Sequence, residues 1–165
     1  NNDDKLFNYI VELLNTMGDV KIEKNFIGAR WAKLLVNAAF SGLSVISNAT
    51  FGEICNNRKS RILALKAIKE CIDVADAANI VIETLQGKDV VKLLNYKTWF
   101  KKQIALMIIP IAMKTHKQIK SSMLRDLERG RKTEVYAING IVCDYGKKYK
   151  PKNHFLKFLI FSLSY

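Results

Sequence analysis

Apolar residues recur with a helical period near the start of the chain. In the segment DDKLFNYIVELLNTM, residues 3–17, they stand at positions 6, 7, 10, 11, 13, 14 and 17. Spacings of three and four residues place these side chains on one face of an α-helix. Asp3 or Asp4 can cap its start, and Gly18 follows its end. The next segment, DVKIEKN at 19–25, alternates between apolar and polar residues, which is typical of a short strand.

From about residue 25 onward the pattern is helical throughout. Residues 27–46 predict one long apolar helix, which Gly42 could interrupt, and residues 60–79 predict an amphipathic helix. The remaining expected helices are one that starts within 87–96, one within 98–122 that Pro110 must kink or end, and one around 131–145.

The composition supports a helical domain with a substantial core. The chain has 165 residues, of which 49% are hydrophobic, and it contains only 8 glycines and 2 prolines. We therefore expect an all-α domain over residues 25–165. A lone helix and a lone strand cannot form a domain, so we interpret residues 1–24 as the last helix and strand of a domain that lies upstream.

The net charge of +12 is concentrated in the second part of the chain. Residues 1–100 carry 13 Lys and Arg against 11 Asp and Glu, whereas residues 101–165 carry 14 against 4. A basic surface can attract nucleic acid or small anions, although a solvated basic face is the commoner case. The basic run at 114–132 contains no aromatic residue and no helix-turn-helix or RNA-binding signature. We expect no nucleic-acid partner and favour a surface that steers an anion.

Several other classes of site and location are disfavoured. The three cysteines form no C-x-x-C pair and the two histidines stand alone, so we expect reduced thiols and no metal. The longest apolar run, 104–113, is too short to span a bilayer and contains Pro110. The opening NNDDK is no signal peptide. These features predict a cytoplasmic protein without a membrane partner.

A polar stripe crosses the apolar segment WAKLLVNAAFSGL, residues 31–43. Lys33, Asn37 and Ser41 follow one another at intervals of four, so a helix places them on one face. A buried ammonium or carboxamide costs on the order of several kcal/mol unless a partner satisfies it. Two explanations of this stripe require no ligand. The head of Lys33 can reach water while its stem covers apolar surface, and Asn37 can hydrogen-bond a neighbouring helix.

A second segment, SSMLRDLERGRKTEVYAING at 121–140, supplies groups that could face this stripe. Ser122 offers a hydroxyl and Glu134 a carboxylate, and a buried lysine needs a carboxylate or a ligand anion beside it. Ser122 could equally be a helix cap, and Glu134 a surface partner of another helical residue.

Together these segments resemble the C-terminal domain of the ketopantoate reductase (2-dehydropantoate 2-reductase) family. The motif W-A-K-L-L-V-N at 31–37 and the block from SSM to ING at 121–140 carry the resemblance. The segments ECIDVADAANI at 70–80 and YGKKYKPKN at 145–153 are also similar to family segments, so that the similarity runs from about residue 6 to 163. It implies an all-α fold of the 6-phosphogluconate dehydrogenase C-terminal-like type. The family's N-terminal Rossmann domain is not represented, since no G-x-G-x-x-G is present.

The resemblance also implies an activity and residue roles. The family reduces ketopantoate to pantoate with NADPH, a step of pantothenate (coenzyme A) biosynthesis. Lys33 matches the catalytic lysine, the general acid, and Asn37 and Ser122 match substrate-binding residues. Glu134 matches a glutamate at the substrate and cofactor cleft. Ser41 stands where the family often has a second asparagine, so we assign it to substrate binding and leave the identity of the 2-keto acid open.

Other functions stay open beside this one. The chain could belong to a related reductase that acts on another 2-keto acid or has no activity, and could serve mainly as a helical dimerisation module. A homodimer is expected in either case, with apolar helices such as 104–113 at the interface. Because NADPH would be bound mainly by the N-terminal domain, we expect this chain alone to be inactive.

Overall fold

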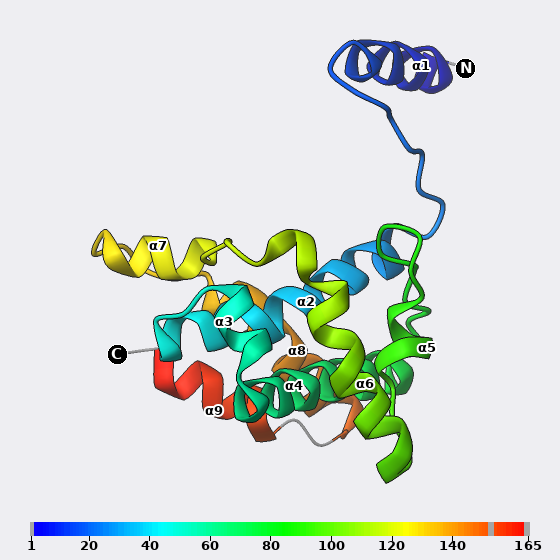
Figure 1. Cartoon of the computed structure of the whole chain (residues 1–165). Coiled ribbons are helices and arrows are strands. Elements are labelled where there is room, and N and C mark those ends of the chain that lie inside the picture. The colour runs from blue at the N-terminus through cyan, green and yellow to red at the C-terminus, as the bar shows by residue number, and fades with distance from the viewer. Residues whose placement is uncertain (1, 152–153, 164–165) are drawn as a thin grey trace.

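The computed structural model of the chain describes residues 2–151 and 154–163, and within them every regular element is a helix (Figure 1). The predicted all-α class is therefore confirmed. Lys152 and Asn153, which end the predicted loop at 145–153, lie outside the described residues. The helices from α2 (Phe26–Ser47) onward form one body whose hydrophobic core is built around α2 and α4 (Arg58–Ala77).

The first helix, α1 (Asn2–Asn15), stands away from this body at the end of an extended segment (Figure 1). Asp3 and Asp4 lie inside its first turn, where the helix dipole favours negative charge, so neither is the cap that the sequence suggested. The predicted apolar face exists but is exposed. Its exposed large side chains are Leu6, Phe7, Ile10, Leu13 and Leu14.

The strand predicted for residues 19–25 is not formed. Among the described residues, the only β-type pairing is an isolated bridge between Leu85 and Lys88. A strand needs a neighbouring backbone for its N–H and C=O groups, and the segment at 19–25 has none in this chain. The predicted unit at 1–24 therefore has its helix but not its strand.

The packing of α2 against α4 forms the centre of the core. Trp31, Leu35 and Phe40 of α2 are buried in one cluster with α4 residues that include Leu65 and Ile68. The indole N–H of Trp31 donates to the carbonyl of Cys71, 3.2 Å away, which satisfies its buried polar atom. Every residue of α2 from Ala38 to Val45 is buried, and burial on all sides over this stretch explains why the sequence of α2 is so apolar.

Gly42 does not interrupt α2, which continues to Ser47. A Cβ at this position would lie 3.3 Å from a methyl group of Leu159 in α9 (His154–Leu163). The glycine lets the two helices approach closely, so its role is in packing rather than in ending the helix.

The segment that follows α6 is held against the start of α3 (Phe51–Asn56). The N–H groups of Phe51 and Gly52 donate to the carbonyls of Ile119 and Lys117, each at 3.0 Å. A Cβ on Gly52 would come within 2.8 Å of the Lys117 carbonyl, so the contact requires glycine. These bonds place the 3₁₀ turn η1 (Lys114–His116) beside α3.

Pro110 lies inside α6 (Trp99–Ala112), two residues before its end. Proline lacks the N–H that would bond the carbonyl of Leu106 four residues earlier. The guanidinium of Arg61 donates to this carbonyl instead, at 3.3 Å. This bond from α4 explains how the helix tolerates the proline. The preceding α5 (Val90–Leu94) is capped by Asp89, whose side chain accepts from the N–H of Lys92 at 2.8 Å.

The helix predicted around 131–145 has a different form. After α7 (Ser122–Glu128) the chain enters a π-helical turn, η2 (Tyr136–Gly140), and then α8 (Ile141–Tyr149).

The final helix α9 is fixed by a buried carboxylate, because Glu70 accepts from the N–H groups of Phe155 and Leu156, both at 3.0 Å. A carboxylate at a helix N-terminus satisfies two orphan donors at once.

Candidate active site

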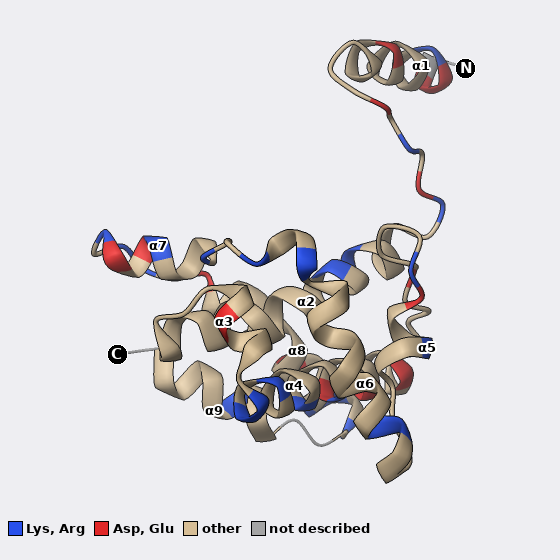
Figure 2. Ribbon diagram, viewed as in Figure 1, with Lys and Arg blue, Asp and Glu red and all other residues tan. Residues whose placement is uncertain are grey.

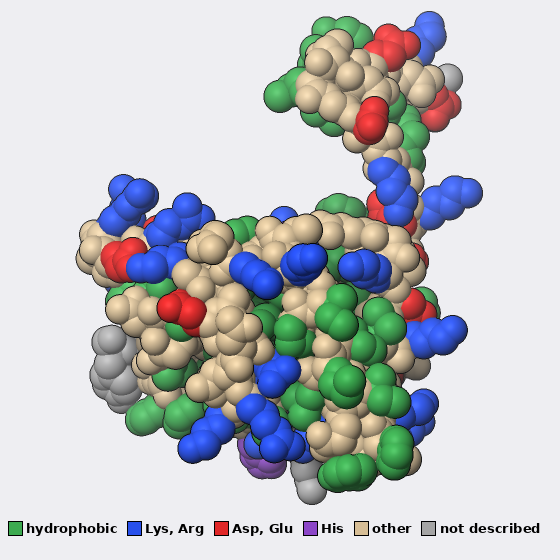
Figure 3. Space-filling view, in the orientation of Figure 1, with side chains coloured by type: hydrophobic (Ala, Val, Ile, Leu, Met, Phe, Trp, Pro, Cys, Tyr) green, Lys and Arg blue, Asp and Glu red, His purple; other side chains and the backbone are tan. Residues whose placement is uncertain are grey.

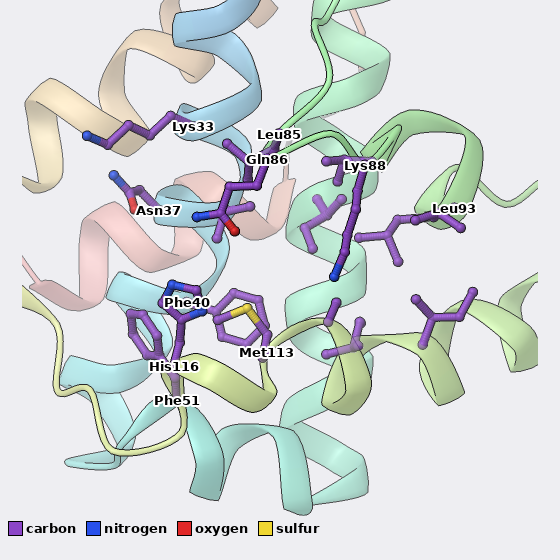
Figure 4. Close-up of a pocket in the computed structure, with 17 residues that line it drawn as sticks. Lys33, Asn37, Phe40, Phe51, Leu85, Gln86, Lys88, Leu93, Met113 and His116 are labelled. Carbon is purple, nitrogen blue, oxygen red and sulfur yellow. The ribbon is translucent and has the colours of Figure 1, made fainter. Parts of the chain in front are cut away.

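Lys33 and Asn37 line a pocket of about 420 Å³ on the side of the helical body. Figure 4 shows the two side chains projecting from α2 to the same side. The amide of Gln86, from the bridged loop at 85–88, reaches toward Asn37. The volume falls within the range of about 300–1,000 Å³ that small-molecule sites occupy. Two of the three residues of the predicted stripe, Lys33 and Asn37, therefore line a ligand-sized cavity.

Most of the pocket wall is apolar. Of the 17 lining residues, the polar ones are Lys33, Asn37, Gln86, Lys88 and His116. Apart from Leu85 and Met113, the others come from α2, α3, α4, α5 and α6, and they include the buried core residues Phe40, Ile68 and Ile109. None of these 17 described residues is acidic, so the pocket suits an anion with an apolar body.

Lys33 is exposed and Asn37 is half-buried. The free-energy cost expected for a buried ammonium therefore does not arise, because the Lys33 head remains hydrated at the pocket mouth. Asn37 lies one helical turn further along, so both can contact one ligand. The chemistry available here is one mobile cation and one neutral amide beside an apolar wall.

Ser41, the third residue of the stripe, lies elsewhere. It is 5% exposed and is not among the residues that line the pocket. The hydroxyl of Ser121 donates to its carbonyl at 3.4 Å, where the start of α7 packs on α2. Its position favours helix packing, and its predicted contact with substrate stays a prediction.

Ser122 and Glu134 are both exposed, and neither lines this pocket. Ser122 is not the helix cap, because Ser121 caps α7 by accepting from the N–H of Leu124 at 3.0 Å. The hydroxyl of Ser122 is therefore not used as a cap. Glu134 stands just before η2, and its carbonyl accepts from the N–H of Ile138 at 3.0 Å.

Both residues lie on a segment that is tied to α2 by buried polar contacts. The N–H of Ser121 donates to the hydroxyl of Ser44 at 3.4 Å, and the amide of Asn139 donates to the carbonyl of Ala38 at 2.9 Å. Ala38 directly follows Asn37 in α2, so this hydrogen bond holds η2 beside the stripe. Asn139 was not identified from the sequence, although an asparagine between apolar neighbours is a signal of a buried contact.

Three further polar residues line the pocket that sequence patterns did not identify. Gln86 and Lys88 belong to the loop in which Leu85 and Lys88 form an isolated β-bridge, and His116 comes from η1. Figure 4 shows His116 grouped with Phe40, Phe51 and Met113 at one end of the pocket. An isolated histidine in a basic run gives no sign of a site, and only the packing of η1 on α3 brings His116 here.

Other reactive groups of the chain are less suited to catalysis. The three cysteines, all among the described residues, are buried thiols outside any disulfide. Burial raises the pKa of the Cys55 and Cys143 thiols to about 11, and it raises the pKa of Cys71 as well. These thiols are therefore protonated near neutral pH and make poor nucleophiles.

Metal-binding clusters and membrane-spanning helices are both absent from the described part of the chain. Residues 2–151 and 154–163 contain no group of three or more His, Cys, Asp or Glu placed to hold a metal ion. Over the same ranges, none of the helices has the length and hydropathy needed to cross a bilayer. Figure 2 shows Lys and Arg spread over several helices and not confined to one of them.

Comparison with known proteins relates this chain to a family of reductases. The family model of the ketopantoate reductase PanE/ApbA C terminal matches residues 25–160. A 2-dehydropantoate 2-reductase from Pyrobaculum aerophilum is 29% identical over 139 residues, which are 84% of this chain and 43% of that protein. The chain thus spans less than half the length of this relative.

Two solved structures share the fold. The dimeric ketopantoate reductase from Staphylococcus aureus superposes with a TM-score of 0.71 and 22% identity over 96% of this chain and 49% of that one. A D-mandelate dehydrogenase in complex with NADH superposes with a TM-score of 0.67 and 20% identity, covering 87% of this chain and 49% of that one. Because the family model covers most of the sequence, the chain belongs to the ketopantoate reductase C-terminal family.

Proposed function

We propose that this chain is the substrate-binding domain of an NADPH-dependent 2-dehydropantoate 2-reductase, which reduces ketopantoate to pantoate in pantothenate biosynthesis. The observation that carries the proposal is that Lys33 and Asn37 project from one face of α2 at the mouth of a pocket with no acidic lining residue. A 2-keto acid presents a carbonyl oxygen and a carboxylate, and both accept hydrogen bonds from such groups. The match of residues 25–160 to the family supports this assignment.

The proposal includes a division of labour between two domains. Residues 25–165 would bind the substrate, and residues 1–24 would complete a nucleotide-binding domain formed by other parts of a longer protein. Two observations support it. The chain spans 43% of the Pyrobaculum relative, and the apolar face of α1 is exposed although such faces are usually covered. The chain alone would then be inactive.

Lys33 would act as the general acid. NADPH, when bound, supplies the hydride that reaches the keto carbon. The keto oxygen gains negative charge as this happens, and an ammonium placed there beforehand stabilises the transition state more than the ground state. Lys33 donates its proton to this oxygen, so the product is an alcohol, and its exposed position lets it regain a proton from water. The amide of Asn37 donates a second hydrogen bond.

Ser122 and Glu134 would complete the site from the α7–η2 side. Both side chains are exposed, and Ser121 and Asn139 anchor their segment on α2. In this arrangement Ser122 binds substrate. The carboxylate of Glu134, an acceptor only, fits hydroxyl or amide donors of the cofactor.

The test is an assay of NADPH oxidation with ketopantoate, using the protein expressed from its complete reading frame. Replacing Lys33→Ala should lower kcat by about 10²–10⁴-fold, the usual contribution of a positioned proton donor. Arg30→Ala is the matched control, since Arg30 is an exposed cation one turn earlier on α2 and does not line the pocket. A Lys33→Ala enzyme as fast as the control would refute the mechanism.

A second candidate activity is the reduction of a different 2-keto acid by the same machinery. Ser41 stands where the family often has an asparagine, and a serine hydroxyl donates one hydrogen bond where an asparagine amide donates two, so the site would suit a different substrate. The related fold of D-mandelate dehydrogenase shows that this architecture occurs in another dehydrogenase. Comparing kcat/KM for ketopantoate with that for other 2-keto acids separates the two activities.

We also propose that the protein forms a homodimer through α6. Residues 100, 104, 107 and 111 follow a helical period and are all exposed and apolar; they are Phe100, Ile104, Met107 and Ile111. Figure 3 shows hydrophobic side chains gathered over the region where α6 lies. The dimeric state of the Staphylococcus aureus protein of the same fold supports a second copy as the occupant.

Light scattering coupled to size-exclusion chromatography tests this interface. Met107→Glu places a charge in the α6 face and should convert a dimer to a monomer. Met17→Glu is the control, because Met17 lies outside α6 and is even more exposed than Met107, 84% against 70%. A dimer that survives Met107→Glu would place the interface elsewhere.

A further inference from the structure

We infer that Gln86 determines specificity in the proposed reductase, because its side-chain amide binds a hydroxyl group on the substituent of the 2-keto acid. Ketopantoate has such a hydroxyl at the end of its substituent, whereas trimethylpyruvate is the same acid without it. This inference rests on the proposed role of Lys33 and Asn37, and it adds a residue from the facing loop to their site. The observations that carry it are a strained tight turn at Gln86 and the position of the Gln86 amide on the Asn37 side of the pocket (Figure 4).

Gln86 and Gly87 are the two central residues of a tight turn. Leu85 and Lys88 exchange backbone hydrogen bonds of 2.9 and 3.0 Å across it, and the φ angles of Gln86 and Gly87 are 51° and 74°. Positive φ at both central residues is the pattern of a type I′ turn, in which asparagine, aspartate or glycine normally takes the first place. Glutamine has no such preference for the left-handed region, so its backbone is strained here. Strain of this kind is found where a side chain has a function, which points to a use for the longer amide.

The segment that leads into this turn is fixed to the start of α2. The side-chain amide of Asn25, the N-cap of α2, donates to the carbonyl of Val81 at 2.9 Å and to the carboxylate of Glu83 at 2.8 Å. The N–H of Glu83 donates to the carbonyl of Gly28 at 3.2 Å. On the other side of the turn, Asp89 caps α5. Both ends of the turn are therefore held in place before a ligand binds, which lowers the entropic cost of using Gln86 as a contact.

The polar groups of the pocket differ in what they can offer to a hydroxyl. The ammonium groups of Lys33 and Lys88 only donate hydrogen bonds, so they suit the carboxylate and the keto oxygen of the acid. A hydroxyl also needs an acceptor for its own proton. Among the 17 described lining residues, the side chains with an accepting oxygen or nitrogen are those of Asn37, Gln86 and His116.

Of these acceptors, Gln86 is the one that is both free and near the proposed reacting end. His116 is grouped with Phe51 and Met113 at the other end of the pocket, whereas the amide of Gln86 reaches toward Asn37 (Figure 4). The Gln86 amide forms no hydrogen bond with any other described residue. A hydroxyl lies only a few bonds from the keto carbon in ketopantoate, so an acid whose keto group is at the Lys33–Asn37 face can place its hydroxyl at Gln86.

The sign of the preference distinguishes this contact from simple burial. A hydroxyl that enters a mostly apolar pocket without a partner loses hydration, so a pocket that ignored the hydroxyl would favour trimethylpyruvate. A hydrogen bond to Gln86 reverses the order. Because Gln86 is exposed and its amide regains water when the ligand lacks a hydroxyl, the preference for ketopantoate should be about threefold to tenfold, the range of one neutral hydrogen bond.

The test compares kcat/KM for ketopantoate and trimethylpyruvate in NADPH oxidation by the protein expressed from its complete reading frame. Gln86→Leu removes the amide at similar size, and it should abolish or reverse the preference while changing kcat/KM for trimethylpyruvate less than about twofold. Gln86→Asn suits the turn better but has a shorter side chain, so it should lose most of the preference without any fall in Tm. Gln103→Leu is the matched control, because Gln103 lies in α6 and does not line the pocket.

The outcomes separate this inference from the proposed function. Turnover of both acids with a preference for ketopantoate that survives in Gln86→Leu and Gln86→Asn would overturn the role of Gln86 and leave the reductase standing, as would an unmodified enzyme that favours trimethylpyruvate. No turnover of either acid by the unmodified protein would refute the proposed function and with it this inference. Loss of the preference in both Gln86 variants but not in Gln103→Leu supports both.

Discussion

The two halves of α2 carry one polar stripe but meet different neighbours. In the first half, Lys33 and Asn37 stand at the mouth of the pocket. In the second half, Ser41 and Ser44 are buried under the start of α7. The difference shows that the same helical spacing can place residues either at an open site or in a closed contact. What covers the helix decides which of the two occurs.

The closed half of α2, which contains Ser41 and Ser44, forms its own hydrogen bonds. The hydroxyl of Ser44 donates to the carbonyl of Ala49 at 2.7 Å and accepts from the N–H of Ser121. Small hydroxyl side chains permit the close approach of α7 and satisfy buried polar groups. In the open half, the larger Lys33 and Asn37 have groups that a ligand can reach. Size and polarity along the stripe therefore match the two environments.

The largest expected difference between the two halves is in catalysis. In the proposed reductase, Asn37→Ala should lower kcat/KM for the keto acid by about 10²–10³-fold, since it removes a donor to the developing oxyanion. Ser41→Ala should change kcat/KM less than about threefold, because removing a buried hydroxyl outside the pocket only perturbs packing. Steady-state kinetics of both variants measures the contrast. A large loss in Ser41→Ala would show that the serine contacts substrate after all.

A smaller effect is expected where α9 covers the closed half. Glu70→Ala removes the carboxylate that accepts from Phe155 and Leu156, and we expect a loss of about 2–3 kcal/mol in the free energy of unfolding, typical of hydrogen bonds to a charged group. Urea denaturation followed by circular dichroism measures it. Asp76→Ala is the control, since Asp76 is an exposed acid on the same helix. Equal stability of the two variants would mean that α9 does not depend on this contact.

The smallest contrast concerns two adjacent serines. Ser121→Ala removes the cap of α7 and should cost about 1 kcal/mol of stability, whereas Ser122→Ala should leave stability within about 0.5 kcal/mol. In the proposed site, kinetics should respond in the opposite order, with KM raised mainly by Ser122→Ala. If Ser122→Ala were the more destabilising of the two, Ser122 would belong to the buried contact between α7 and α2 and not to the open site.

Much of the helical architecture could be predicted from local pattern. The apolar period of α4 is visible in the sequence because burying one face of a helix requires it, and α1 has such a period although its face is exposed in this chain. The long apolar run of α2 is visible as well. The end of α6 shortly after Pro110 was also predictable from the missing N–H. The strand at 19–25 was wrong for a different reason: alternation describes side chains, whereas a strand also needs a partner backbone.

The candidate site was only partly predictable. The helical spacing of Lys33 and Asn37 is enough to make them neighbours, because residues four apart share one face of a helix. Three other features depend on contacts between segments far apart in sequence. Ser41 belongs to the closed half, Lys88 and His116 reach the same pocket, and Arg61 satisfies the carbonyl freed by Pro110.

The sequence by itself determined that this protein is helical, which faces of its helices are apolar and which polar residues share a face, because these properties follow from spacing along one element. Only the tertiary structure decided which of those faces is covered and which opens into a cavity. Burial and cavity shape are set by how several helices pack together, and no single segment contains that information.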